Sequence, residues 1–159
     1  MPRNSPARFL ILLLAATCGL GAGGCWSAHP HSAYRLIHQC AISGDVAGVT
    51  AELAQHPDEL NLPEDDGLTP LHLAAENCHT NVVLLLLDRG AKIDVLANDD
   101  ATPLHLAAQE GCADAVKVLL AHKARIDVRD KQGRTPLDRA RQWNQTNIVT
   151  LLQQHGVNQ

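Results

Sequence analysis

Basic residues are scarce in this chain of 159 residues, which carries 13 Lys and Arg against 17 Asp and Glu and a net charge of −4 at pH 7. This balance argues against nucleic acid and against anionic lipid as the main partner. The apolar run Phe9–Ala16 is too short to cross a membrane comfortably. The sequence also lacks a nucleophile motif and a glycine-rich phosphate loop between a strand and a helix. We therefore expect no enzyme.

The first 24 residues carry the pattern of a secretory signal. Arg3 and Arg8 precede the apolar run, and small residues such as Gly19 and Gly21 follow it. The two arginines do not form a twin-arginine motif, so general secretion is the expected route. Without this segment, the chain would carry 11 basic and 17 acidic residues, which is a net charge of about −6.

A possible lipidation site follows the signal pattern. Ala22-Gly23-Gly24-Cys25 resembles the lipobox of bacterial lipoproteins, in which the cysteine is lipidated and becomes the new N-terminus. The resemblance predicts a lipid anchor on Cys25 and a tether over residues 25–33. Ordinary cleavage and an uncleaved anchor are the alternatives, because Ala22 stands where Leu is usual. Trp26 follows in place of Asp, which in that family favours the outer membrane of a bacterium with two membranes.

Beyond residue 33, one short phrase occurs three times at a fixed spacing. It begins at Thr69, Thr102 and Thr135, which are 33 residues apart, and the first two copies read Thr-Pro-Leu-His-Leu-Ala-Ala. Thr is a good N-cap, Pro fits the first helical position, and the Leu and Ala that follow form an apolar stripe at helical spacing. A fixed period of this length is typical of stacked supersecondary units.

A second apolar stretch follows each copy and predicts a second helix; the stretches are Val82 to Leu87, Ala115 to Leu120 and Ile148 to Leu152. We expect left-handed helix ends at Gly90 and Gly156, with Lys123 in the equivalent place at a cost of up to about 1 kcal/mol. Polar, turn-like segments separate the copies, and Gly67, Asp100 and Gly133 occupy equivalent positions in these turns.

This pattern resembles the ankyrin repeat in its period, in the Thr-Pro-Leu-His phrase, in the paired alanines and in Gly90-Ala91. A weaker copy at residues 36–41 adds a first unit, with one residue inserted near Pro57. The resemblance covers residues 34–159 and implies an all-α repeat fold. This would be an ankyrin solenoid of four stacked helix-turn-helix units joined by hairpin-like turns, with repeats at about 34–66, 67–99, 100–132 and 133–159.

The last copy has the features of a terminal cap. Arg141 stands where Ala75 and Ala108 stand in the preceding copies, and Gln153 replaces a leucine. Terminal repeats need a polar outer face, so we expect the array to end with this unit.

In ankyrin-like stacks, partners usually touch the hairpin tips and the exposed face of the first helices. The resemblance therefore implies partner-binding residues at Asp65, Asp66, Leu68, Leu73, Glu76, Asn98, Asp99, Leu106, Gln109, Lys131, Arg134, Arg139 and Trp143. Trp143 is interpreted either as a binding hot spot or as the cover of the terminal cap. The tips change from acidic to basic along the array, which either steers a partner of opposite gradient or reflects ordinary polar turns.

Three cysteines lie within the array. Cys40 aligns with Ala74, so we expect it to be a small buried core residue. Cys78 and Cys112 lie in the inter-helix turns of adjacent units, one register apart. An oxidising compartment permits a disulfide between them. However, adjacent repeats in this family stack roughly 10 Å apart, beyond the Cα separation that a disulfide allows. We expect free thiols, with the disulfide as the alternative.

Nine histidines suggest metal binding, but the alignment gives most of them a structural role. His38, His72 and His105 share one repeat position, where in ankyrin repeats the imidazole typically bonds to nearby backbone. His29 and His31 in the tether would bind a metal only weakly. We expect no metal and no cofactor.

The resemblance to ankyrin repeats implies a non-enzymatic protein-binding module. The signal pattern and the lipobox resemblance imply that it is displayed in the cell envelope, in the periplasm and lipid-anchored to the outer membrane. The partner would be a protein of unknown identity, which a rigid curved face masks or supports. The alternatives are an immunity-type inhibitor of a toxic envelope enzyme, such as a lipase, and a general structural scaffold. We expect a monomer that contacts the membrane through its lipid anchor only and binds no nucleic acid.

Overall fold

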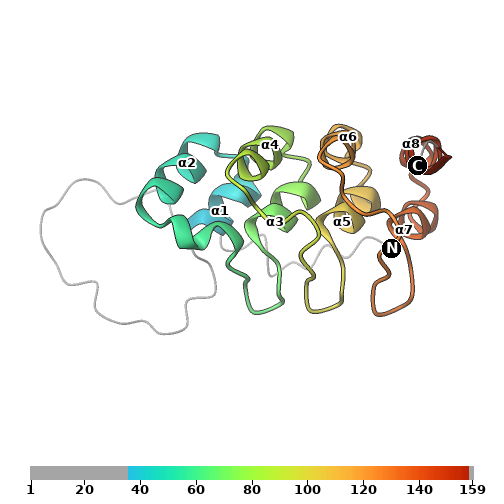
Figure 1. Ribbon diagram of the computed structural model, residues 1–159, viewed down its shortest axis with the longest axis horizontal. Helices are drawn as coiled ribbons and strands as arrows, with labels where there is room; N and C mark the ends of the chain where they lie inside the picture. The colour runs from blue at the N-terminus through green and yellow to red at the C-terminus, as the bar shows by residue number, and fades with distance from the viewer. Residues whose placement is uncertain (1–35, 158–159) are drawn as a thin grey trace, which may run out of the picture. The chain divides into compact units, whose positions relative to one another are not determined.

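The computed structural model describes residues 36–157, so the predicted signal segment, Cys25 and the tether lie outside the described residues. The regular secondary structure of residues 36–157 consists of α-helices and one short 3-10 helix, which are joined by turns and loops, and these residues contain no strand. The α-helices form four successive pairs: α1 (Leu36–Ser43) and α2 (Val46–Gln55), α3 (Pro70–Glu76) and α4 (Thr80–Asp88), α5 (Pro103–Glu110) and α6 (Ala113–Ala121), and α7 (Pro136–Gln142) and α8 (Thr146–Val157). Figure 1 shows the pairs stacked side by side, which confirms the expected all-α solenoid.

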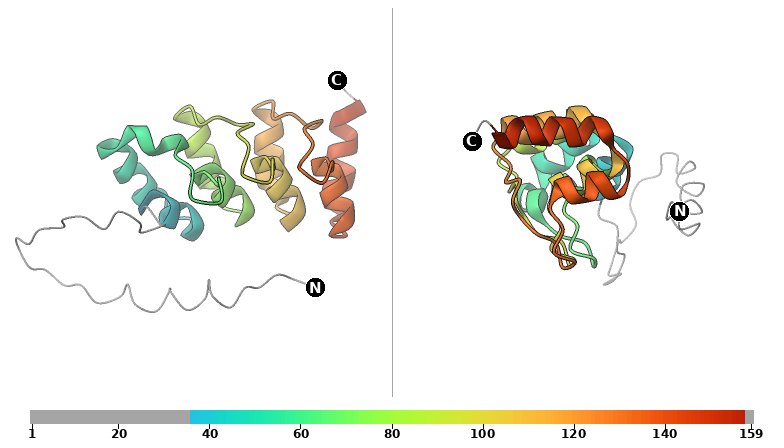
Figure 2. Two further views of the ribbon diagram at one scale, coloured as in Figure 1. Left: turned by 90° about the horizontal axis from the view of Figure 1, so that it is seen from below. Right: turned by 90° about the vertical axis from the view of Figure 1, so that its right-hand side faces the viewer.

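The helices of the described part lie in two layers. The first helices α1, α3, α5 and α7 contact one another in order, and the second helices α2, α4, α6 and α8 form the other layer. Long loops between successive pairs project beyond the first helices, and Figure 2 shows that these loops lie in register along the stack. We call these loops the hairpins; their tips are residues 64–68, 97–101 and 130–134.

The repeated phrase starts the first helix of each of the last three units, as predicted. Thr69, Thr102 and Thr135 are the N-caps of α3, α5 and α7, and a proline occupies the first turn of each helix. In α3, the Thr69 backbone N–H donates to His72 Nδ1 at 3.2 Å. In α7, Asp138 takes the histidine's place, and its Oδ2 accepts from the Thr135 backbone N–H at 3.0 Å. Residues of the repeated phrase therefore supply hydrogen-bond partners for the backbone N–H groups at the start of each helix.

Small side chains let the units stack closely. The paired alanines Ala74, Ala75, Ala107 and Ala108 are fully buried. Around them, large apolar side chains such as Leu71, Leu86, Leu104, Leu119 and Ile148 fill one continuous core that runs through the stack. Burying one such side chain stabilises the fold by about 1.5–3 kcal/mol, so the stacking of neighbours, and not the short helices themselves, holds the array together.

Backbone hydrogen bonds fix each hairpin and tie it to its neighbour. Within the hairpins, the N–H of Ala97 donates to Ala101 O and the N–H of Asp130 donates to Arg134 O, both at 2.9 Å. Between hairpins, the N–H of Asn98 donates to Asp66 O at 3.0 Å. The N–H of Lys131 donates to Asp99 O at 2.9 Å in the same manner. The hairpin tips therefore form one connected row.

The left-handed turn positions agree with the sequence pattern in all but one case. Gly67, Asp100 and Gly133 have φ values of 82°, 60° and 75°. At the ends of the second helices, Gly90 has φ 88° and Lys123 has φ 67°. The equivalence of these positions is therefore confirmed.

The expected left-handed helix end at Gly156 is wrong. Gly156 lies inside α8, which continues to Val157, and its φ is outside the left-handed region. At Gly90 the chain reverses toward the next hairpin, and the N–H of Ala91 bonds back to Leu86 O at 2.9 Å. In α8, by contrast, the helix runs through Gly156 to Val157.

The inserted residue near Pro57 is accommodated by a 3-10 helix, η1 (Pro57–Asn61), which follows α2 directly.

Across residues 36–157, none of the helices has the length and apolar character that a membrane span needs.

Candidate functional site

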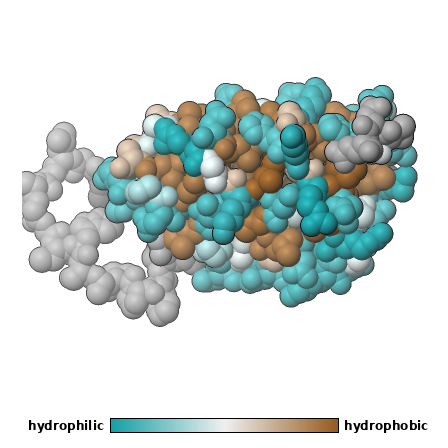
Figure 3. Space-filling model, viewed as in Figure 1, coloured by the Kyte–Doolittle hydropathy of each residue, from teal (hydrophilic) through white to brown (hydrophobic). Residues whose placement is uncertain are grey.

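The hairpin tips and the adjoining first helices make up the predicted binding face. Ten of its predicted residues are accessible. The exposed ones are Asp65, Asp66, Asn98 and Lys131, and the half-buried ones are Leu68, Glu76, Asp99, Gln109, Arg134 and Trp143. Figure 3 shows mainly hydrophilic residues along the edge that the hairpin tips form. The accessible face is therefore polar at the tips.

The expectation that Leu73 and Leu106 lie on the exposed face is wrong. Leu73 is 1% exposed and Leu106 is 8% exposed. The equivalent residue in the last unit, Arg139, shows what covers this position, because its guanidinium bonds to Asp130 in its own hairpin and to Asp99 in the preceding one. The space between the hairpins and the first helices is therefore part of the interior, and the apolar side chains of Leu73 and Leu106 fill it in their units.

The expectation that Arg139 is a partner-binding residue on the surface is also wrong. Arg139 is 3% exposed, and its Nε donates to Asp130 Oδ2 at 2.8 Å. Its Nη2 donates to Asp99 Oδ2 at 2.9 Å, across the boundary between two units. Asp130 and Arg139 occupy the positions that Ala97 and Leu106 hold in the preceding unit. A buried ion pair thus replaces an apolar pair in the last unit.

The pKa of the Asp130 carboxyl is held well below its usual range. Burial alone would raise the pKa, but hydrogen bonds from the Arg134 side chain and backbone and from Arg139 outweigh it. Arg134 Nε donates to Asp130 Oδ2 at 3.0 Å, so Arg134 is engaged inside the protein as well. The pKa of Asp99 is lowered for the same reasons, since the Arg139 hydrogen bond and charge outweigh its burial. Asp99 and Arg134, two of the charged residues that were expected to form a gradient along the tips, are therefore already paired.

The repeated histidines have the structural role that was expected of them. His72 Nδ1 accepts from the Thr69 backbone, so the neutral ring carries its proton on Nε2, which donates to Ala101 O at 3.1 Å. His105 Nε2 donates to Arg134 O at 3.1 Å in the same way. His38 bonds to Leu62 O at 2.8 Å. Each ring thus fastens a first helix to a hairpin.

Burial favours the neutral form of the His72 and His105 rings. It lowers the pKa of His72 to about 4, although the hydrogen bond to Ala101 O and nearby carboxylates act in the opposite direction. Burial also lowers the pKa of His105. Among residues 36–157, no group of three His, Cys, Asp or Glu side chains is placed to hold a metal ion.

The expectation of free thiols at Cys78 and Cys112 is wrong, because the two form a disulfide. Their Cα atoms are 5.0 Å apart, which is within the usual range for a disulfide. The separation of about 10 Å between repeats applies to equivalent residues, and these two are not equivalent: Cys78 corresponds to Gly111, the residue before Cys112. Cys40 is buried with a free thiol, as expected.

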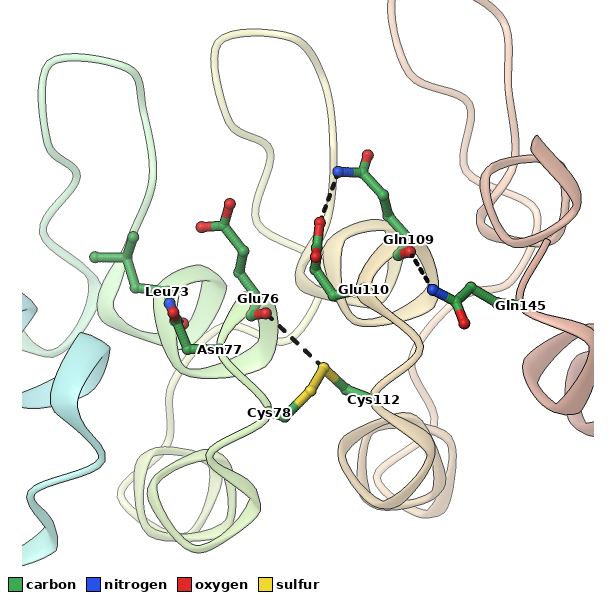
Figure 4. The surroundings of a disulfide bond; sticks show 8 residues. All are labelled: Leu73, Glu76, Asn77, Cys78, Gln109, Glu110, Cys112 and Gln145. Atoms are coloured by element: carbon green, nitrogen blue, oxygen red, sulfur yellow. Dashed lines mark hydrogen bonds between the residues drawn. A yellow bond between two sulfur atoms is a disulfide. The ribbon is translucent and has the colours of Figure 1, made fainter. Parts of the chain in front are cut away.

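The disulfide lies in the turns between first and second helices (Figure 4). Cys78 has a positive φ of 60°, and its equivalents Gly44, Gly111 and Asn144 also have positive φ values, of 75°, 79° and 57°. This left-handed backbone directs the Cβ of the residue toward the next unit. The sequence places the two cysteines in adjacent units, but the direction of the Cys78 Cβ follows only from the left-handed backbone at that position.

Residues 10–99 and 90–159 each match the family model described as ankyrin repeats in three copies. These matches cover most of the chain, and the protein belongs to the ankyrin-repeat family. A curated relative is palmitoyltransferase akr1 of Neurospora crassa, which is 35% identical over 65 residues. That match covers 41% of this chain and 9% of the relative, so the chain spans less than a tenth of the relative's length. Ankyrin repeats are protein-interaction modules, which makes a protein the expected kind of partner.

Proposed function

We propose that this protein is a non-enzymatic binding module of the cell envelope, and that the row of hairpin tips holds and masks one partner protein. The observation that carries this proposal is the hydrogen-bonded connection from tip to tip. Asn98 N–H bonds to Asp66 O, and Lys131 N–H bonds to Asp99 O, so the exposed side chains are presented in a fixed order. A preorganised face of this kind binds with a small entropic cost.

The composition of the row suggests what the partner presents. Asp65 and Asp66 are exposed at the first tip, whereas Lys131 and Arg129 are exposed at the third. Asp99 and Arg134 contribute less, because each is already paired with a side chain of the same protein. A partner with basic residues opposite the first tip and acidic residues opposite the third would be oriented on the row as it approaches.

Trp143 lies at the C-terminal end of α7 in the last unit. It is the C-cap of α7, with its N–H bonded to Arg139 O at 3.1 Å, and it is half-buried. This placement supports a double use, in which the residue closes the end of α7 while its accessible part adds apolar contact area.

The proposal of secretion has support from a residue pair outside the signal segment. Disulfides form and persist in oxidising compartments such as the bacterial periplasm. The Cys78–Cys112 disulfide therefore favours the same destination as the signal pattern before Cys25. We propose export, lipidation of Cys25 and attachment to the outer membrane.

The binding proposal is tested by capture from the envelope. The full-length chain with a C-terminal affinity tag is expressed in its source cells, the envelope is solubilised, and captured proteins are identified by mass spectrometry. We expect one envelope protein in near-equimolar amount. Several proteins in small amounts would indicate a scaffold and contradict the single-partner proposal, and no envelope protein at all would contradict binding itself.

The anchor proposal is tested by Cys25→Ser. Because lipidation requires the thiol, the variant should leave the membrane fraction and appear soluble in the periplasm. Cys40→Ala, which changes a buried thiol of the array, serves as the control and should stay with the membrane. A Cys25→Ser chain that remains membrane-bound and lipidated would show that the anchor is elsewhere.

A further inference from the structure

Each boundary between adjacent units has the same kind of contact at the position of the disulfide. The residue after the left-handed turn position reaches back to a carbonyl of the preceding unit. His79 Nε2 donates to Ile42 O at 2.8 Å, and Gln145 Nε2 donates to Gln109 O at 3.1 Å. Cys112 is the equivalent residue at the middle boundary, and its Sγ lies 3.8 Å from Glu76 O (Figure 4).

The left-handed turn position explains why a second cysteine belongs here. At the other two boundaries this position is Gly44 and Gly111. A Cβ on Gly44 would lie 2.6 Å from His79 Nδ1, and a Cβ on Gly111 would collide with the side chain of Gln145. Such a Cβ points directly at the reaching side chain of the next unit. A non-glycine residue fits at Cys78 because the atoms that would collide are covalently bonded instead.

The two sulfur-bearing residues differ in their access to solvent. Cys78 is exposed, whereas Cys112 is 4% exposed. A hollow of about 220 Å³ adjoins Cys78 and is lined by Gly44, Cys78, His79, Thr80, Asn81 and Val82. The hollow therefore gives a small thiol room to approach the disulfide from the side of Cys78.

We propose that Cys78 is a thiol-exchange site of the native protein, at which a thiolate attacks Cys78 Sγ and Cys112 leaves. In the first step, a bond forms between the incoming sulfur and Cys78 Sγ, the Cys78–Cys112 bond breaks, and Cys112 departs as a thiolate that takes up a proton. A second thiolate then attacks the incoming sulfur of the mixed disulfide and releases Cys78. Two thiols are oxidised to one disulfide, and the protein disulfide is reduced by two electrons.

The fold can accept the leaving thiol. Once protonated, the Cys112 thiol can donate to Glu76 O, 3.8 Å away, and it then makes the same kind of contact as His79 and Gln145. Those two boundaries hold without a covalent bond. Reduction therefore converts the middle boundary to the form that its neighbours already have, and does not require unfolding.

The rate law of reduction tests this proposal. The oxidised full-length chain is incubated with increasing concentrations of reduced glutathione, quenched with iodoacetamide and mapped by mass spectrometry. We expect the exposed Cys78 thiol to become labelled at a rate proportional to the glutathione concentration, while Cys112 and Cys40 are labelled much more slowly because both are buried. A rate that saturates, with Cys40 labelled at the same pace, would mean that reduction waits for unfolding and would overturn the proposal.

Variants that keep only one cysteine of the disulfide pair test the direction of attack. In Cys112→Gln, the remaining Cys78 should form a mixed disulfide with oxidised glutathione at least about tenfold faster than the remaining Cys112 does in Cys78→Gly. Equal rates would overturn the assignment of Cys78 as the attacked sulfur. The double variant Cys78→Gly/Cys112→Gln reproduces the Gly111–Gln145 pair. It should keep the far-UV circular dichroism of the oxidised protein, and an unfolded double variant would contradict the claim that the boundary holds without the disulfide.

Discussion

At the scale of single residues, the repeated histidines join the first helices to other parts of the chain through their ring nitrogens. His72 uses both ring nitrogens, one toward Thr69 at the start of α3 and one toward Ala101 in the following hairpin, and it has no exposed surface. A protonated ring could not accept from the Thr69 N–H, and its charge would be buried. The histidine is thus a structural residue that works only in its neutral form.

This requirement predicts a decline of stability in mild acid. The pKa of His72 is lowered from 6.5 to about 4. The unfolded chain binds the proton more readily than the folded protein does. The free energy of unfolding should therefore have its full value above pH 6.5 and fall as the pH decreases toward 4. The fall should be roughly 3 kcal/mol from His72 alone, and His105 adds to it in the same direction.

Urea unfolding at several pH values between 7.5 and 4.5 measures this decline, together with NMR titration of the His72 ring. The carboxylates Asp99 and Asp130 do not interfere in this range. Their pKa values are lowered, so the stability that they contribute is lost only below about 3.8, the ordinary value for Asp. An unchanged free energy of unfolding down to pH 4.5, or a His72 ring that titrates near 6.5, would contradict the assigned role.

At the scale of elements, the hairpins cover the first helices, and the units of α5 and α7 fill the space between hairpin and helix in two different ways. In the unit of α5, Ala97 and Leu106 are buried at the two equivalent positions. In the unit of α7, Asp130 and Arg139 are buried there, and Arg139 also reaches Asp99 in the preceding hairpin. The ion pair places charged groups in the interior of the protein, which costs desolvation free energy. In return, the pair links two hairpins.

Breaking this pair and replacing it should have opposite outcomes. Arg139→Leu leaves Asp130 buried without one of its partners and should destabilise the protein by about 3 kcal/mol. The double variant Asp130→Ala/Arg139→Leu reproduces the Ala97–Leu106 pair and should recover most of that loss. Urea unfolding of the three proteins measures both effects. A double variant that is no more stable than Arg139→Leu would show that the last unit cannot use the apolar arrangement.

Much of the fold could be predicted from the sequence because its determinants are local. The Thr-Pro start, the helical stripe and the glycine turns each act within a few residues, and the 33-residue period repeats them. The burial of Leu73, Leu106 and Arg139 depends on how a hairpin folds over its neighbours. The disulfide depends on the direction of a Cβ between units. Neither of these is encoded in local periodicity.

At the scale of the whole molecule, the stacked units of the described chain present one row of hairpin tips supported by a continuous core. The family accounts for the scaffold, and the exposed side chains on the row are what distinguish this protein from other scaffolds of its kind. The first tip carries two adjacent carboxylates, Asp65 and Asp66, and both residues are exposed. The central claim is that this row, and not the layer of second helices, binds the partner.

The most direct test compares charge removal on the two sides of the stack. Asp65→Asn/Asp66→Asn removes two charges from the first tip while keeping side-chain shape, and Asp88→Asn/Asp114→Asn removes two exposed charges from α4 and α6 as the matched control. Calorimetry of each full-length variant with the captured partner, at two salt concentrations, gives affinity and salt dependence. The tip variant should bind at least about tenfold more weakly with a flatter salt dependence, and the control should bind as the parent does. Unchanged binding by the tip variant, with loss in the control, would contradict the account.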